Sequence, residues 1–404
     1  MNLDVDHSYP KQDPSLEETP RTAAQLMGEK PIKKLGFGFM RLPLLDENDP
    51  ASIDLKQTKK MVDTFLAHGF TYFDTAWMYC GFQSEPAIRK ALVERYPRDR
   101  FTLATKLHIG YVEKDQDRDE ILSRQLEKTG VEYFDYYLLH DVNAQHLPLY
   151  ERYDCFNWLL EKRQQGVVRN IGISFHGDAP LLEQVLTKYP FLDFVQLQIN
   201  YLDWESPGVQ SRLCYETALR HKKPVVIMEP VKGGALTHVP REAEQAFRAC
   251  HPHLSIASWA IRFAASLNHV ITVLSGMSNL AQLEDNISFM TDFHPMTDQE
   301  KALVLQWAPS IQQETVIPCT GCGYCLDGCP KQIAIPKYFG LYNTEHQHNQ
   351  QKGYTSPKEY YNDTLTRIFG AAGDCLHCGK CEKICPQHLP IMQYLKAVAN
   401  YFGK

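Results

Sequence analysis

The segment Gly69-Phe-Thr-Tyr-Phe-Asp-Thr-Ala-Trp-Met-Tyr79 points more directly to a fold than any other part of this 404-residue chain. It begins with a short β-rich run that ends at the carboxylate of Asp74, and the phenol of Tyr79 follows in the next loop. In a parallel β/α barrel the catalytic side chains come from the C-terminal ends of the strands. Asp74 and Tyr79 therefore stand where such a barrel places its chemistry.

Two further strand-like runs end on an ionisable side chain. The run 101–106 ends at Lys106, and the run 134–140 ends at His140. A single charged residue or histidine at a strand end is more often structural than catalytic. Four such groups in this order, inside a repeated β/α pattern, favour a catalytic site.

Strand-like and helix-like segments alternate along most of the chain, eight of each. The predicted strands are 35–40, 70–74, 101–106, 134–140, 167–173, 193–198, 224–228 and 270–274. The predicted helices are 57–68, 84–95, 118–129, 151–165, 179–187, 209–221, 254–267 and 279–290. This alternation predicts an α/β fold of the (β/α)₈ TIM barrel type. An open doubly wound sheet is disfavoured because no G-x-G-x-x-G motif lies between a strand and a helix.

Three motifs carry a resemblance to a known family. Phe73-Asp-Thr-Ala-x-x-Tyr79, Thr105-Lys106 and Leu138-Leu-His140, in this order and spacing, resemble the catalytic tetrad of the aldo-keto reductases. The resemblance implies an enzyme that uses NADPH or NADH to reduce a small carbonyl compound or to oxidise an alcohol.

The resemblance also implies a role for each member of the tetrad. Tyr79 is the general acid and base, and His140 orients the carbonyl oxygen or relays the proton. A free tyrosine has a pKa of about 10. We therefore expect the ammonium of Lys106, held in place by Asp74, to lower the pKa of Tyr79. Trp77, Phe82 and Trp204 are expected to border the substrate pocket.

The same resemblance predicts eight cofactor contacts from five strand ends. They are Gly38, Ser174, Gln196, Met228, Gly276, Ser278, Gln282 and Asn286. Gly38 is equally well explained by a barrel strand that needs a small residue, and a helix N-cap is the alternative role for Ser278 or Asn279. Met228 stands where an aromatic ring commonly stacks on the nicotinamide. A 2′-phosphate calls for a basic residue, and Gly276 and Gln282 stand at those positions, so both nicotinamide cofactors remain open.

Eight of the twelve cysteines lie in two C-terminal motifs. Residues 319–330 read C-x₂-C-x₂-C-x₃-C-P, and residues 375–386 repeat this spacing. In such a run three thiolates hold one iron–sulfur cube and the fourth crosses to its neighbour. We predict two [4Fe–4S] clusters, one on Cys319, Cys322, Cys325 and Cys385, the other on Cys375, Cys378, Cys381 and Cys329. Zinc is the competing interpretation of C-x₂-C pairs, and the repeated third cysteine and Cys-Pro disfavour it.

The segment between the two motifs contains helix-like pieces at 336–342 and 357–369. It resembles the connection in helical two-cluster ferredoxin domains, and the whole chain resembles the ferredoxin-containing aldo-keto reductases of prokaryotes. The predicted domains are an N-terminal extension over 1–30, a barrel over 31–295, and a helical linker with a dicluster ferredoxin-like domain over 296–404.

The charge and hydrophobicity of the chain limit the kinds of partner that we expect. The net charge is −6, with Lys and Arg scattered along the chain, so neither nucleic acid nor a membrane surface is an expected partner. No apolar run is long enough to span a bilayer, and residues 1–34 carry no signal-like apolar stretch. These features predict a cytoplasmic protein.

Three functions for the clusters stay open at this point. They exchange electrons with a redox partner, they make the barrel a docking or redox-sensing platform, or they are purely structural. Nicotinamide transfers two electrons as a hydride whereas a cluster accepts one at a time. Direct coupling of the two therefore needs a flavin or a partner protein.

Overall fold

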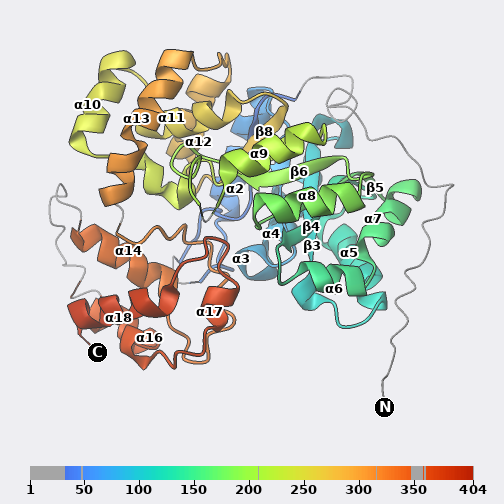
Figure 1. The fold of residues 1–404 in the computed structure, drawn as a ribbon. Coiled ribbons are helices and arrows are strands. Elements are labelled where there is room, and N and C mark those ends of the chain that lie inside the picture. The colour runs from blue at the N-terminus through green and yellow to red at the C-terminus, as the bar shows by residue number, and fades with distance from the viewer. Residues whose placement is uncertain are drawn as a thin grey trace.

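The computed structural model describes residues 32–46, 49–207, 209–314, 316–346, 358 and 361–403, and Figure 1 shows their arrangement. The predicted N-terminal extension, residues 1–30, lies outside the described residues.

In the described residues, eight parallel strands form a closed barrel, with β8 paired to β1. They are β1 (Leu35–Gly38), β2 (Tyr72–Asp74), β3 (Thr102–His108), β4 (Phe134–Val142), β5 (Val168–Phe175), β6 (Phe194–Gln198), β7 (Val225–Met228) and β8 (Val270–Ser275). Each overlaps a predicted strand, so the (β/α)₈ fold is confirmed. The strands are buried on both faces, which is why their sequences are nearly continuous apolar runs.

Helices surround the barrel (Figure 1). They are α2 (Leu55–Ala67), α4 (Ser84–Ile88), α5 (Gln116–Thr129), α6 (Leu147–Arg152), α7 (Cys155–Gln164), α8 (Ala179–Lys188), α9 (Ser211–Arg220), α11 (Ile256–Ala265) and α12 (Leu280–Met290). The predicted helix 84–95 continues from α4 as a π-helical segment, Arg89–Val93. The predicted helix 151–165 is interrupted between α6 and α7, where Asp154 has a φ of 46°.

Inside the barrel, large side chains fill the space between the strands. The inner cluster contains Tyr72, Tyr136, Phe194 and Leu274, all nearly inaccessible to solvent. A Cβ at Gly172 would lie 2.7 Å from the ring of Phe194. The barrel is therefore a packed core whose chemistry is confined to its mouth.

Two helices extend the barrel before the chain reaches the cysteine motifs. The helix α10 (Arg241–Cys250) was not predicted, and its Phe247 stacks on Trp259 with ring centroids 4.7 Å apart. The helix α13 (Asp298–Glu314) adds Val304 and Ile311 to the same apolar cluster. The linker helix thus packs on the barrel.

The C-terminal domain is mainly helical, as predicted. It contains α14 (Ile335–His346), a π-helical segment (Tyr361–Leu365), α16 (Thr366–Ile368), α17 (Lys380–Lys383) and α18 (Ile391–Phe402). These elements form the orange and red body that lies against the barrel in Figure 1. In the part of the chain that the structure describes, no helix is both long and apolar enough to cross a membrane.

Candidate active site

The four predicted catalytic residues come together at the C-terminal mouth of the barrel. Asp74 is the last residue of β2, Lys106 lies in β3 and His140 in β4. Tyr79 opens α3 (Tyr79–Phe82), a short kinked turn in which Cys80, Gly81 and Phe82 all have a positive φ. All four residues are at most 8% exposed. The strand ends thus bring together groups that are far apart in the sequence.

Lys106 and Asp74 form a buried ion pair. Nζ of Lys106 lies 2.5 Å from Oδ1 of Asp74 and donates a second hydrogen bond to the carbonyl of Thr75 at 2.8 Å. Burial lowers the pKa of Lys106 and raises that of Asp74, so desolvation opposes the pair. The close hydrogen bonds hold it together. The same ammonium stands 5.0 Å from the centroid of the Tyr79 ring.

The expectation that Lys106 lowers the pKa of Tyr79 is wrong for this state of the site. Burial raises the pKa of Tyr79 well above its ordinary value, and the negative charge of Asp74 acts in the same direction. The charge of Lys106 is already balanced by Asp74. Burial, aided by the charge of Lys106, lowers the pKa of His140 well below its usual range. Near neutral pH the site therefore presents a neutral phenol beside a neutral imidazole.

A cavity of about 270 Å³ opens at this mouth, and Asp74, Tyr79 and His140 border it. Seven of the eight predicted cofactor contacts line the same cavity, namely Gly38, Gln196, Met228, Gly276, Ser278, Gln282 and Asn286. Ser174 is not among the lining residues, and its Oγ lies 3.8 Å from the Sδ of Met228. The catalytic and cofactor candidates therefore share one cavity.

The predicted aromatic wall is wrong. Trp77, Phe82 and Trp204 are not part of the cavity lining. Nζ of Lys128 lies over the Trp77 ring, 3.8 Å from its centroid. Trp204 packs edge-on against Phe263. Trp77 and Trp204 thus pack against neighbouring side chains and Phe82 is exposed, so none of the three borders this cavity.

One end of the cavity suits the carboxamide of a nicotinamide ring. Nε2 of Gln196 lies 3.4 Å from the Sδ of Met228, while the buried Oε1 of Gln196 has no hydrogen-bond partner among the described residues. A buried carbonyl oxygen without a donor is unfavourable. An amide N–H₂ placed beside Met228 would satisfy this oxygen, so the residues fit the cofactor.

The opposite end lies at the start of α12. Oε1 of Gln282 accepts a hydrogen bond from the backbone N–H of Ser278 at 2.7 Å. The N-cap of α12 is Asn279 and not Ser278, since its side chain accepts from the N–H of Gln282 at 2.9 Å. Asn286 donates to Ser275 Oγ at 2.8 Å. The predicted cofactor contacts at this end of the cavity are therefore mostly polar, and none of them is basic.

Arg41 is a basic residue of the lining that the sequence analysis missed. Its Cδ would lie 3.2 Å from a Cβ placed on Gly276. The guanidinium is engaged elsewhere, because Nη2 donates to the carbonyl of Thr320 at 2.5 Å and lies 3.7 Å from Glu229. Arg41 follows the first strand and belongs to no recognisable sequence motif. Its hydrogen bond to the C-terminal domain forms only when the two domains dock.

Tyr324 is the second residue that the sequence analysis missed. It lies between Cys322 and Cys325 and reaches the active-site cavity from the C-terminal domain. Its hydroxyl lies 3.0 Å from Nε2 of His140 and interacts with the Tyr79 phenol. The cysteine spacing identifies metal ligands, but nothing in it shows that the residue between them faces a barrel.

A polar contact joins the two domains at the edge of the cavity. The side-chain amides of Gln198 and Gln387 exchange two hydrogen bonds, of 2.9 and 2.7 Å. Gln198 also donates to Asp203, which pairs with Lys232 at 2.5 Å. All four side chains are buried, so the C-terminal domain closes part of the barrel mouth.

The eight motif cysteines border two cavities. Cys319, Cys322, Cys325 and Cys385 lie around one, and Cys329, Cys375, Cys378 and Cys381 lie around the other. Each set takes three cysteines from one motif and the last from the other, as in the predicted ligand sets. Among the described residues of both linings there is no histidine or carboxylate. An all-sulfur donor set fits an iron–sulfur cluster.

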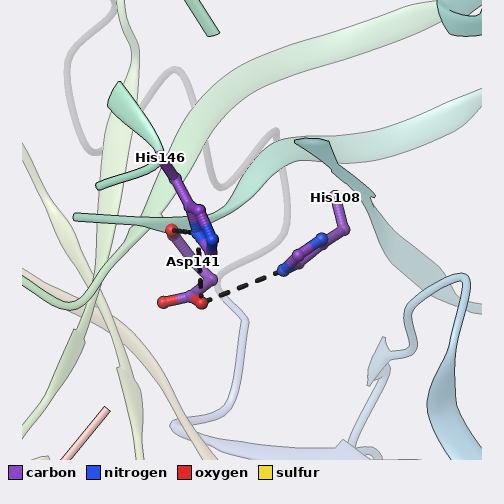
Figure 2. Close-up of side chains that lie close together, drawn as sticks. All are labelled: His108, Asp141 and His146. Carbon is purple, nitrogen blue, oxygen red and sulfur yellow. Dashed lines mark hydrogen bonds and ion pairs between the residues drawn. The ribbon is translucent and has the colours of Figure 1, made fainter. Parts of the chain in front are cut away.

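His108, Asp141 and His146 form a His–Asp–His group (Figure 2), and the ring centroid of His108 lies 5.6 Å from that of His140. Oδ2 of Asp141 lies 3.3 Å from Nδ1 of His146 and 3.8 Å from Nε2 of His108. Two histidines and a carboxylate are also a metal-ligand set. Here the backbone N–H of Gly110 donates to Nδ1 of His108 at 3.0 Å. Because Nδ1 accepts this hydrogen bond, a neutral His108 ring carries its proton on Nε2, the atom that faces Asp141. A metal ligand would need a lone pair on that atom, so this arrangement does not favour a metal.

This group instead stabilises the end of β4. Burial acts to raise the pKa of Asp141, but the neighbouring His108 and His146 side chains hold it well below its usual range. Nδ1 of His146 also lies 2.9 Å from the carbonyl oxygen of Asp141. Asp141 has a φ of 56°, a backbone conformation that a non-glycine residue rarely adopts, and the contact of His146 with its carbonyl oxygen helps to secure it. These contacts thereby fix the position of His140.

Comparison with known proteins agrees with both parts of the chain. The sequence model of the aldo/keto reductase family matches residues 34–306, and that of the 4Fe-4S dicluster domain matches residues 318–389. The chain is 25% identical over 303 residues to the uncharacterized oxidoreductase YqkF of Bacillus subtilis, covering 67% of this chain and 92% of that protein. It is 24% identical over 297 residues to L-galactose dehydrogenase of Arabidopsis thaliana, covering 68% and 90%.

Solved structures share the barrel fold. An aldo-keto reductase of Bacillus halodurans in its holo form has a TM-score of 0.55 and 22% identity, over 69% of this chain and 95% of that one. An aldo/keto reductase of Klebsiella pneumoniae in complex with NADP and acetate has a TM-score of 0.56 and 19% identity, over 69% and 92%. The family model spans well over half of the chain, so this protein belongs to the aldo/keto reductase family and carries a 4Fe-4S dicluster domain after its barrel.

Proposed function

We propose that the protein is an NADPH- or NADH-dependent oxidoreductase that interconverts a small carbonyl compound and the corresponding alcohol. The observation that carries this proposal is the shared cavity, since Tyr79, His140 and Asp74 border the same space as seven cofactor candidates. A carbonyl reductase needs a proton donor close to its hydride donor. The candidate proton donor and the candidate cofactor contacts lie together at the mouth of the barrel.

A nicotinamide cofactor supplies the hydride when it is bound. Gln196 and Met228 would hold its carboxamide end, because they offer the unpaired oxygen of Gln196 and the apolar thioether of Met228. Ser278, Gln282 and Asn286 border the adenosine end. The solved structure of the Klebsiella pneumoniae protein contains NADP, which supports a nicotinamide cofactor for this fold.

The protein's own groups handle the proton and the oxygen. Tyr79, neutral near pH 7, donates its hydroxyl proton to the carbonyl oxygen as the alcohol forms, and it accepts that proton in the reverse direction. The Lys106–Asp74 pair lies beside Tyr79, with the ammonium 5.0 Å from the ring centroid, and helps to hold the phenol in position. His140, neutral because it is buried, orients the oxygen with a hydrogen bond from Nε2.

The position of Cys322 favours a role for the clusters in electron transfer. Cys322 borders both the active-site cavity and the first cysteine cavity. We propose that the clusters exchange single electrons with a redox partner protein close to the site of hydride transfer. Because a hydride carries two electrons and a cluster accepts one at a time, a further carrier must lie between them, and we propose that the partner protein supplies it.

The variant Tyr79→Phe tests the proposed reaction. Removing the general acid should lower the rate of carbonyl reduction by about 10²–10⁴-fold, while nicotinamide binding and iron content stay unchanged. Tyr401→Phe is the matched control, because this tyrosine is exposed on α18 far from the cavity lining. Carbonyl reduction at the wild-type rate in Tyr79→Phe would contradict the assignment.

A second variant tests the cofactor preference. Replacing Gln282 with arginine adds a cation at the adenosine end, where a 2′-phosphate would lie. Gln282→Arg should therefore tighten the binding of NADPH relative to NADH, measured by nicotinamide fluorescence. An unchanged ratio of the two dissociation constants would place the 2′ position elsewhere.

A further inference from the structure

The active site already has an oxygen atom at the position a carbonyl oxygen needs. In the proposed reaction the substrate oxygen must lie within hydrogen-bond distance of both the Tyr79 hydroxyl and Nε2 of His140. The hydroxyl of Tyr324 already lies 3.0 Å from Nε2 of His140, and it interacts with the Tyr79 phenol. Its ring packs edge-on against the His140 ring with centroids 6.0 Å apart.

The loop that carries Tyr324 is held from two sides. On one side Cys322 and Cys325 face the first cysteine cavity, so a bound cluster fixes the backbone on either side of the tyrosine. On the other side the carbonyl of Thr320 accepts a hydrogen bond from Arg41 of the barrel. The same carbonyl packs so closely on Gly233 that an added Cβ would lie 2.0 Å from its oxygen. The loop that carries the phenol of Tyr324 is therefore held in place by both domains.

Resting on the proposed function, we propose that Tyr324 holds the carbonyl-oxygen position and determines which ligands enter the active site. A carbonyl oxygen, or a carboxylate that imitates it, binds to Tyr79 and His140 only when the phenol moves aside. Since cluster ligands flank Tyr324 on both sides, the conformation of the cluster loop sets this access. The dicluster domain thus contributes a specificity-determining residue to the barrel.

Acetate is the probe for this oxygen position, because its carboxylate accepts hydrogen bonds from a phenol and an imidazole in the same way. The experiment measures the dissociation constant of acetate for the intact, cluster-loaded protein with bound NADPH, from the change in nicotinamide fluorescence. Three variants are compared with the wild type. They are Tyr324→Ala, which removes the ring, Tyr324→Phe, which keeps the ring and removes the hydroxyl, and Tyr401→Ala, a surface control on α18.

The expected result is a clear order of affinities. Tyr324→Ala should bind acetate about tenfold or more tightly than the wild type, since hydrogen bonds to an ionised acceptor are worth at least that factor. Tyr324→Phe should stay close to the wild type because its ring still fills the position. Tyr401→Ala should not differ from the wild type, and iron content should be the same in all four proteins.

Two outcomes would overturn the inference. One is equal acetate affinity in the wild type and Tyr324→Ala. The other is loss of acetate binding in Tyr324→Ala with iron content and nicotinamide binding retained, which would make Tyr324 part of the ligand site instead of its occupant.

The same samples separate this inference from the proposed function. If Tyr324→Ala gains acetate affinity but reduces no carbonyl compound, Tyr324 holds the oxygen position and the proposed reaction is wrong. If the wild type reduces carbonyls in a Tyr79-dependent way and Tyr324→Ala leaves acetate affinity unchanged, the reaction stands and the inference is wrong.

Discussion

The two sides of the active-site cavity are held in place by different means. On the barrel side, Asp74, Lys106 and His140 lie at the ends of strands whose backbones are hydrogen-bonded in a closed ladder. On the opposite side, Tyr324 and Gln387 lie in cysteine-containing loops outside the helices. The barrel side is therefore positioned by its own core, whereas the other side depends on the loops that surround the clusters.

The cores of the two parts differ in the same way. The barrel buries a large apolar cluster that contains side chains from its strands and surrounding helices. The core of the C-terminal domain is much smaller and includes Cys325, Cys381 and Cys385 among its buried members. A small domain with few apolar contacts usually needs metal or disulfide cross-links to stay folded. We therefore expect the barrel to tolerate loss of a cluster better than the C-terminal domain does.

The largest effect should come from removing a cluster ligand. Cys375→Ser should lose one cluster and the hydrogen-exchange protection of α14 and α18, while the barrel strands remain protected. Iron and sulfide analysis with hydrogen exchange followed by mass spectrometry measures both effects. Cys250→Ser is the matched control, because Cys250 is an exposed thiol on α10. Loss of protection throughout the barrel would show that the two parts fold as one unit.

A smaller effect should follow from separating the two domains. Gly233 has a φ of 64°, and a Cβ there would lie 2.0 Å from the carbonyl oxygen of Thr320. Gly233→Ala should therefore displace the cluster loop and weaken the hydrogen bond between Tyr324 and His140. Gly234→Ala is the control, since Gly234 also has a positive φ, of 100°, but no atom within 4 Å of the added Cβ.

Limited proteolysis between α13 and α14 should be faster in Gly233→Ala than in Gly234→Ala, with cluster content unchanged. Equal rates would mean that backbone strain, which both variants share, dominates over contact with the C-terminal domain.

A pH titration tests the barrel alone. Lys223 lies next to β7 and donates hydrogen bonds to the carbonyls of Pro190 and Leu192, each at 2.6 Å. Burial lowers its pKa from 10.5 to about 8. Between these values the unfolded state binds more protons than the folded state, so this group makes stability rise with pH. The gap corresponds to about 3 kcal/mol in the free energy of unfolding.

The measurement is denaturant unfolding of the wild type and Lys223→Met from pH 7 to 11. The stability of the wild type relative to Lys223→Met should increase between pH 8 and 10.5. The result should be the same in iron-free protein, because Lys223 belongs to the barrel. If the difference in unfolding free energy between the wild type and Lys223→Met does not vary with pH, the pKa of Lys223 is not lowered.

The smallest effect should come from the amide pair at the domain boundary. Gln387→Ala leaves the buried amide of Gln198 without its reciprocal partner. The free energy of unfolding of the C-terminal domain should fall by about 1–3 kcal/mol. Gln393→Ala on α18 is the control, since that side chain is exposed. Equal stabilities would show that water replaces the lost hydrogen bonds at this boundary.

Local patterns in the sequence were sufficient for the barrel and for the chemistry of the cysteine motifs. Alternating strand-like and helix-like runs located all eight strands in the described residues, because each strand is a short apolar run bounded by polar turns. The pKa of Tyr79 was predicted in the wrong direction because the burial of a phenol and the neutralisation of Lys106 by Asp74 arise only in the folded site. The helix α10 was missed because only a narrow face of it, with Ala243 and Phe247, is buried.

The sequence by itself determined which residue types stand at the strand ends and at metal-ligand spacing. Both are matters of distance along the chain. Only the tertiary structure decided that Tyr324 lies against His140, that Gln387 pairs with Gln198, and that Arg41 ties the barrel to the cluster loop. These contacts join residues more than 180 positions apart and depend on how two domains dock, which no local periodicity or spacing encodes.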